Sequence, residues 1–175
     1  MSLIPTTSTG VSIERQALIL AHIQNNPLGS YVFSGPPGVG KTTVLRELER
    51  LARAKCPRNY AVYSKTASQY QRDATAAARG EHVSGLLRAQ SLKTDAAHGV
   101  RWAIFLDDVD KLTGSEFIRV QLFDLFNAAC EQREPSTQVV MSTNMSKLEF
   151  GRFFGDHIAW RIFKYCTWVG MERAA

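Results

Sequence analysis

The residues with the clearest chemical signature form the glycine-rich segment GPPGVGKTT at positions 35–43. It fits the pattern G-x-x-x-x-G-K-[ST], in which backbone N–H groups converge on phosphate oxygens because glycine places no Cβ in their way. Lys41 is expected to bridge the β and γ phosphates of a nucleotide, and Thr42 to offer its hydroxyl to Mg²⁺. The candidate nucleotide-binding residues are Gly35, Pro36, Pro37, Gly38, Val39, Gly40, Lys41, Thr42 and Thr43.

A pair of carboxylates supplies the second half of such a phosphate site. Asp107 and Asp108 directly follow the apolar run Trp102–Leu106, which has the composition of a strand buried on both faces. Asp107 is expected to hold the Mg²⁺ shell through water, and Asp108 to orient and deprotonate the water that attacks the γ-phosphate. Asp110 is expected to be a turn or cap residue, with the alternative that it takes the place of Asp108. The sequence therefore predicts ATP and Mg²⁺ as cofactors.

The elements that must position these residues alternate between strands and helices. Apolar, β-rich runs predict strands over 31–33, 61–63, 102–106, 138–141 and 166–169. Apolar residues at three- and four-residue spacing predict helices over 13–23, 42–54, 67–78, 83–92, 117–130, 148–154 and 157–163. Strands separated by helices of this length require right-handed crossovers and a parallel sheet covered on both faces. We expect an α/β fold, the three-layer α/β/α sandwich of P-loop NTPases with a five-stranded parallel sheet.

Length and composition limit the classes of protein. The chain has 175 residues, of which 45% are hydrophobic and 21% charged, so it can form one domain with a core but not a multidomain enzyme. We expect a lead and helix over 1–29 and the core over 30–175. Three separated cysteines favour neither a disulfide framework nor a CxxC zinc site, and they are expected to be reduced core thiols. With no apolar run long enough for a membrane span, we expect a cytoplasmic protein with no membrane partner.

The positive charge is concentrated in one third of the sequence. Residues 46–101 contain 11 basic and 5 acidic residues, whereas the formal net charge of the whole chain is +5. Two interpretations remain open from charge alone: a solvated helical face with scattered arginines, or a surface that binds nucleic acid.

Four segments together resemble the AAA+ ATPases and, within them, the DnaC/IstB group of bacterial helicase loaders and transposition helper ATPases. The segments are GPPGVGKTT, AIFLDD, VVMSTN at 139–144 and FGDHIAWRI at 154–162. The resemblance implies that Asn144, with Thr143 beside it, is the sensor 1 residue that positions the attacking water. It also implies that Arg161 is an arginine finger that reaches the nucleotide of a neighbouring subunit, with Arg152 as the second candidate.

The same resemblance implies an ATPase that assembles on DNA through nucleotide-bridged interfaces and serves a replicative helicase or a transposase. The region of residues 46–101 would then contact phosphates of DNA, either single-stranded or without sequence preference. The aromatic residues near the finger motif are expected to be core or subunit-contact residues rather than a platform for bases: Phe153, Phe154, Trp160 and Trp168.

The sequence departs from the family pattern in two places. Only about thirty residues precede the first expected strand, where the family carries a partner-binding domain, and the chain ends shortly after the fifth strand, where AAA+ modules carry a helical lid. We expect the lid to be absent and nucleotide to be held loosely. Three other functions remain possible: a small P-loop kinase, a viral-type replication helicase core, and a nucleotide-dependent interaction module without hydrolysis.

Overall fold

A single parallel sheet organises the molecule, as the computed structural model shows for residues 19, 21–55, 60–112, 116–130 and 137–171. The strand order is β2-β3-β4-β1-β5, and every neighbouring pair is parallel. The strands are β1 (Tyr31–Ser34), β2 (Tyr60–Thr66), β3 (Arg101–Asp107), β4 (Thr137–Thr143) and β5 (Thr167–Gly170). This confirms the predicted five-stranded parallel sheet.

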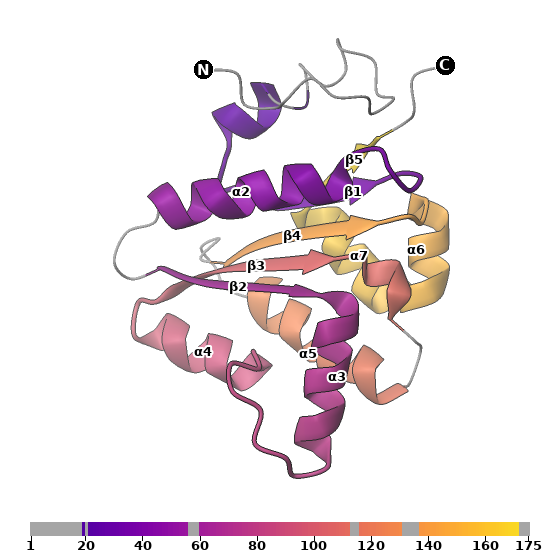
Figure 1. Cartoon of the computed structure of the whole chain (residues 1–175). Helices are drawn as coiled ribbons and strands as arrows, with labels where there is room; N and C mark the ends of the chain where they lie inside the picture. The colour runs from indigo at the N-terminus through magenta and orange to yellow at the C-terminus, as the bar shows by residue number, and fades with distance from the viewer. Residues whose placement is uncertain (1–18, 20, 56–59, 113–115, 131–136, 172–175) are drawn as a thin grey trace.

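Helices cover both faces of this sheet. Helix α2 (Lys41–Lys55) lies along one face, and α5 (Glu116–Cys130) and α7 (Asp156–Tyr165) lie on the other (Figure 1). The remaining elements are α3 (Ala67–Ala78), α4 (Ala89–Ala97), the 3₁₀ helix η1 (Val109–Lys111) and α6 (Lys147–Phe154). Residues 21–25 are helical, but most of the helix predicted over 13–23 lies outside the described residues. The three-layer α/β/α sandwich is confirmed.

Alternate residues of the central strands divide the core into two halves. On β3, Ala103 and Phe105 join the apolar cluster under α2, whereas Ile104 and Leu106 join the cluster under the helices of the opposite face. All four side chains are buried. A strand buried on both faces needs a continuous apolar run, because successive side chains point to opposite faces. This packing fixes β3 and therefore the carboxylates that follow it.

The helix predicted over 83–92 is wrong, because α4 begins only at Ala89 and residues 83–88 precede it without helical structure. Val83, Leu86 and Leu87 have the i, i+3, i+4 spacing of a helical face, and Leu87 is buried in the core cluster with Leu86 packed against it. Leu87 reaches the core from a loop instead. Arg88 has extended backbone angles, φ −120° and ψ 154°, and is the N-cap at which the helix starts.

The aromatic residues near the C-terminus differ in how deeply they are buried. The Phe150 ring is buried with its centroid 4.4 Å from that of Phe154 and 5.4 Å from that of Trp168. Trp160 is 59% exposed and is therefore not a core residue, so of its two expected positions the subunit contact stays a prediction. It lies on the outer face of α7 because the apolar residues of this amphipathic helix, such as Ile158 and Ile162, turn toward the core.

Two cysteines agree with the expected core thiols. Cys130 and Cys166 are buried and form no disulfide, and burial raises the pKa of the Cys166 thiol. Cys56 lies outside the described residues. Within the part of the chain that the structure describes, no helix combines the length and the apolar character that a bilayer crossing requires.

Candidate nucleotide-binding site

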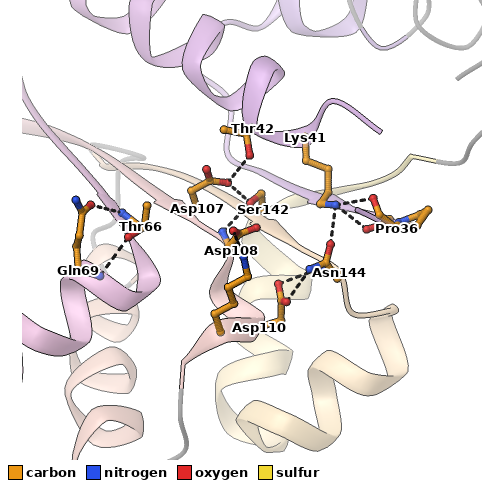
Figure 2. A network of polar contacts seen from close by, with 12 residues as sticks. Pro36, Lys41, Thr42, Thr66, Gln69, Asp107, Asp108, Asp110, Ser142 and Asn144 are labelled. Atoms are coloured by element: carbon orange, nitrogen blue, oxygen red, sulfur yellow. Dashed lines mark hydrogen bonds and ion pairs between the residues drawn. The ribbon is translucent and has the colours of Figure 1, made fainter. Parts of the chain in front are cut away.

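The sheet topology brings the two sequence motifs together at the carboxyl edge of the strands. Strands β3, β4 and β1 are neighbours, and their parallel register pairs Leu106 with Met141 and Ser34 with Thr143. The loop that follows β1 and the carboxylates that follow β3 therefore leave the same edge of the sheet, where ligands bind in open α/β folds. Figure 2 shows that side chains from these segments face one another.

The glycine-rich loop has the backbone that its sequence demands. Gly35 has φ +153°, and a Cβ there would lie 1.9 Å from the carbonyl oxygen of Met171. Gly40 has φ +92°, and a Cβ there would meet nothing within 4 Å. Gly40 immediately precedes α2, whose first N–H groups lack partners within the helix and point toward the loop. The loop and this helix end fit a phosphate chain.

Lys41 is the most constrained cation of the site. Its side chain is 5% exposed, and Nζ donates to Gly35 O at 2.7 Å, Pro36 O at 2.9 Å and Asn144 Oδ1 at 2.8 Å. An ammonium has three N–H donors, so all are used within the chain. Burial lowers the pKa of Lys41, and the nearby charges of Asp108, Asp110 and Asp107 oppose this.

Three oxygen-bearing side chains meet beside the start of α2. Thr42 Oγ1 donates to Asp107 Oδ1 at 3.1 Å, and the Ser142 hydroxyl donates to the same carboxylate oxygen. Hydroxyl and carboxylate oxygens at this spacing are the hard ligands that Mg²⁺ prefers, so Thr42 and Asp107 fit the predicted metal position. Ser142 was not among the site residues predicted from the sequence. Its signal was a polar residue within an apolar strand that is fully buried.

The remaining carboxylates have different partners. The backbone of Asp108 is in the left-handed region, with φ 58° and ψ 50°. Its N–H donates to Ser142 Oγ. Its carboxylate oxygen Oδ2 forms a hydrogen-bonded ion pair with Lys111 Nζ at 2.7 Å. That hydrogen bond raises the pKa of Lys111. Asp110 accepts from the backbone N–H of Asn144 at 2.9 Å and from Asn144 Nδ2 at 2.8 Å. Asp110 therefore belongs to the site and is more than the turn or cap residue expected from sequence.

Arg161 stands apart from this network. It lies on α7, where Nη1 donates to His157 O of the same helix at 3.1 Å. Its guanidinium lies 5.0 Å from the centroid of the Phe123 ring on α5. Arg152, the second candidate, is an exposed residue of α6. The structure thus brings Lys41 and the motif carboxylates together with Asn144, but neither arginine.

Several solved structures with the same fold come from DNA replication proteins. AMPPCP-bound DnaA from Aquifex aeolicus superposes with a TM-score of 0.67 at 18% identity, covering 92% of this chain and 47% of that one. DnaA bound to AMPPCP and single-stranded DNA gives 0.68 at 16% identity, with coverage of 98% and 48%. The DnaC helicase loader gives 0.69 at 17% identity, with coverage of 97% and 96%.

The chain spans about half the length of the DnaA chains that it matches. At these identities the likeness establishes the fold. Among proteins of curated function, none matches this chain. Residues 31–149 match the family described as ATPase family associated with various cellular activities (AAA), and this match contains the glycine-rich loop, the β3 carboxylates and Asn144. The protein therefore belongs to the AAA family of ATPases.

Proposed function

We propose that this protein hydrolyses ATP with Mg²⁺ at the carboxyl edge of its sheet, and that it does so while assembled on DNA as a helicase loader or a transposition or replication accessory ATPase. Family membership supports nucleotide hydrolysis in general. The observation that carries the proposal is the meeting of Lys41, the Thr42–Asp107 pair and Asn144 at one edge.

Each side chain of this edge has a proposed role in hydrolysis. Lys41 neutralises phosphate charge, and its present partners, two backbone carbonyls and one amide, are groups that phosphate oxygens can replace. Thr42 and Asp107 hold Mg²⁺, which when bound supplies charge neutralisation on the phosphate oxygens. Asp108 takes the proton of the attacking water, and Asn144 orients that water.

Arg161 is proposed to act on the nucleotide of a neighbouring subunit. Its polar partner within the described residues is a backbone carbonyl of its own helix, and the Phe123 ring supports its guanidinium from one side. An arginine held in this way keeps most of its five N–H donors available to another molecule. Self-association through nucleotide-bridged interfaces is therefore part of the proposal.

DNA is proposed to contact the side of the molecule formed by α3. A cavity of about 470 Å³ there is lined by Arg72, Arg79 and Lys111, with Glu81 as its acidic residue. Within the described part of the chain, neither the Arg72 nor the Arg79 guanidinium has a hydrogen-bond or ion-pair partner. Unpaired arginines around a cavity suit phosphodiester groups. The similarity to a DnaA chain bound to single-stranded DNA supports the same choice.

The deciding experiment measures phosphate release from ATP by the purified protein alone, with single-stranded DNA and with duplex DNA, in Mg²⁺ and after chelation of Mg²⁺. We expect Mg²⁺-dependent release that DNA increases. The matched control is Lys41→Ala, which should lose release under every condition.

The alternatives give different results in the same assay. Transfer of the phosphate to a small acceptor in place of water would identify a kinase. Nucleotide binding without release under any condition would identify an interaction module. Processive strand separation by the protein alone would identify a helicase core, and cytoplasmic fractionation of the native protein tests its proposed location.

A further inference from the structure

Asp110 directs both of its carboxylate oxygens at a single residue. Oδ1 accepts the backbone N–H of Asn144 at 2.9 Å, and Oδ2 accepts Asn144 Nδ2 at 2.8 Å (Figure 2). Asp110 lies in η1, after β3, whereas Asn144 follows β4, so this pair joins two strand ends that are 34 residues apart. The contact is long-range and has two points of attachment, unlike a local helix cap.

These contacts fix which end of the Asn144 amide faces the nucleotide side. A side-chain amide has a donor end and an acceptor end, and hydrogen-bond partners decide its orientation. At Asn144 a carboxylate lies at one end and the ammonium of Lys41 at the other, 2.8 Å from Oδ1. A carboxylate requires the donor end and an ammonium requires the acceptor end. Only one orientation of the amide satisfies both.

We propose that Asp110 is a positioning residue, which holds the Asn144 amide with its oxygen toward Lys41 and so keeps Lys41 in place before nucleotide binds. This inference rests on the proposed function, because it concerns the same site. Lys41 reaches Asn144 across 103 positions of sequence, from the first residue of α2. The chain Asp110–Asn144–Lys41 therefore ties the ends of β3 and β4 to the glycine-rich loop.

The arrangement gives Asn144 a specific polarity during catalysis. Once Lys41 turns to phosphate oxygens, Asn144 Oδ1 is left as a hydrogen-bond acceptor, while Nδ2 stays on Asp110. An acceptor at this place orients a water molecule by taking a hydrogen bond from one of its O–H groups and takes no proton itself. Asp110 does not suit the role of base, because accepting a proton would weaken both of its contacts with Asn144.

The first test replaces the Asp110 carboxylate with an amide. In Asp110→Asn, two amide donors face each other unless Asn144 turns over, which would point its NH₂ at the Lys41 ammonium. We expect kcat to fall about 10- to 100-fold, within the usual range for a misplaced reacting group, while affinity for the non-hydrolysable analogue AMPPCP changes less than about threefold. Glu47→Gln, which changes a surface carboxylate of α2 that pairs with Arg50, is the matched control and should alter neither quantity.

A second readout needs no nucleotide. Asn144→Asp places two carboxylates against each other and should lower the Tm, whereas Asn144→Asp combined with Asp110→Asn restores a donor and an acceptor. We expect the double variant to melt about 3 °C or more above Asn144→Asp, a coupling of the size seen between contacting residues.

These results separate the inference from the proposed function. If Asp110→Asn keeps its kcat, or if the double variant melts no higher than Asn144→Asp, the inference is wrong. A double variant that fails to fold also overturns it. A wild-type protein that releases no phosphate overturns the proposed function alone, since the melting comparison on nucleotide-free protein still decides whether Asp110 positions Asn144.

Discussion

Lys41 and Arg161 are both proposed to act on the γ-phosphate, yet their surroundings differ sharply. Lys41 is almost fully buried and has three oxygen partners, two of them in its own loop. Arg161 is half-buried and has one backbone carbonyl of its own helix and one aromatic face. Lys41, which is proposed to act on nucleotide bound to its own chain, is already held in place by hydrogen bonds within that chain. A cation that acts on another molecule keeps its hydrogen-bonding capacity outside these contacts.

The largest expected effect tests this contrast directly. Arg161→Ala should keep ATP affinity but lower hydrolysis about 10³- to 10⁵-fold, which is what an arginine supplied to a neighbour's phosphate contributes. Mixing this variant with Lys41→Ala should restore part of the activity, because the Arg161→Ala subunit binds ATP and receives an arginine from its neighbour. Turnover of each protein and of the mixture is the measurement.

Two outcomes would break the contrast. If specific activity stays constant over about a hundredfold dilution and mixing restores nothing, Arg161 is a structural arginine and the protein works alone. If Arg152→Ala loses turnover instead, the arginine that acts in trans lies on α6.

The next largest effect concerns the proposed base. Asp108→Asn should leave ATP bound but slow hydrolysis by about 10²-fold or more, the usual contribution of a positioned base. Single-turnover hydrolysis, together with binding of AMPPCP, separates these two quantities. Normal hydrolysis by Asp108→Asn, combined with an inactive Asp110→Asn, would show that the two aspartates have been assigned the wrong way round.

The third largest effect concerns DNA binding by the arginines that line the cavity beside α3. Reversing both Arg72 and Arg79 to Glu should weaken binding to single-stranded DNA and reduce the slope of log affinity against log salt by about 1.4, because each phosphate contact contributes about 0.7. Lys147→Glu is the matched control, since this exposed lysine begins α6 and lies outside residues 46–101. Fluorescence anisotropy at several salt concentrations gives both quantities. An unchanged slope in the double variant would make the cavity a solvated surface.

The smallest effect concerns the ion pair between Asp108 and Lys111. Lys111 Nζ lies 2.7 Å from Asp108 Oδ2, so it occupies a carboxylate oxygen that the attacking water would otherwise use. Because exposed ion pairs contribute up to about 1 kcal/mol, Lys111→Met should raise the single-turnover rate about two- to fivefold. A lower rate in Lys111→Met would mean that Lys111 itself assists the reaction.

Features that depend on local sequence could be predicted, whereas features that depend on contacts between distant segments could not. The strands and the glycine-rich loop were predictable because apolar runs and glycine spacing are local properties of sequence. The start of α4 was not, because Leu87 reaches the core from a loop and completes a false helical face. Asp110 and Ser142 acquire their partners only when β3 and β4 align. The polar Ser142 within a largely apolar strand was a signal, but its segment did not indicate which residue it would contact.

Gly35 and Gly40, which lie at the two ends of the glycine-rich loop, differ in how well they would tolerate substitution during evolution. Any side chain at Gly35 would collide with the backbone carbonyl of Met171, whose N–H donates to Ser34 O at 2.6 Å, so folding itself requires glycine there. A side chain at Gly40 meets open space and costs only backbone strain, of order 1–3 kcal/mol. A lineage that lost its nucleotide would therefore drift at position 40 and keep glycine at position 35, leaving a record of the lost activity in its sequence.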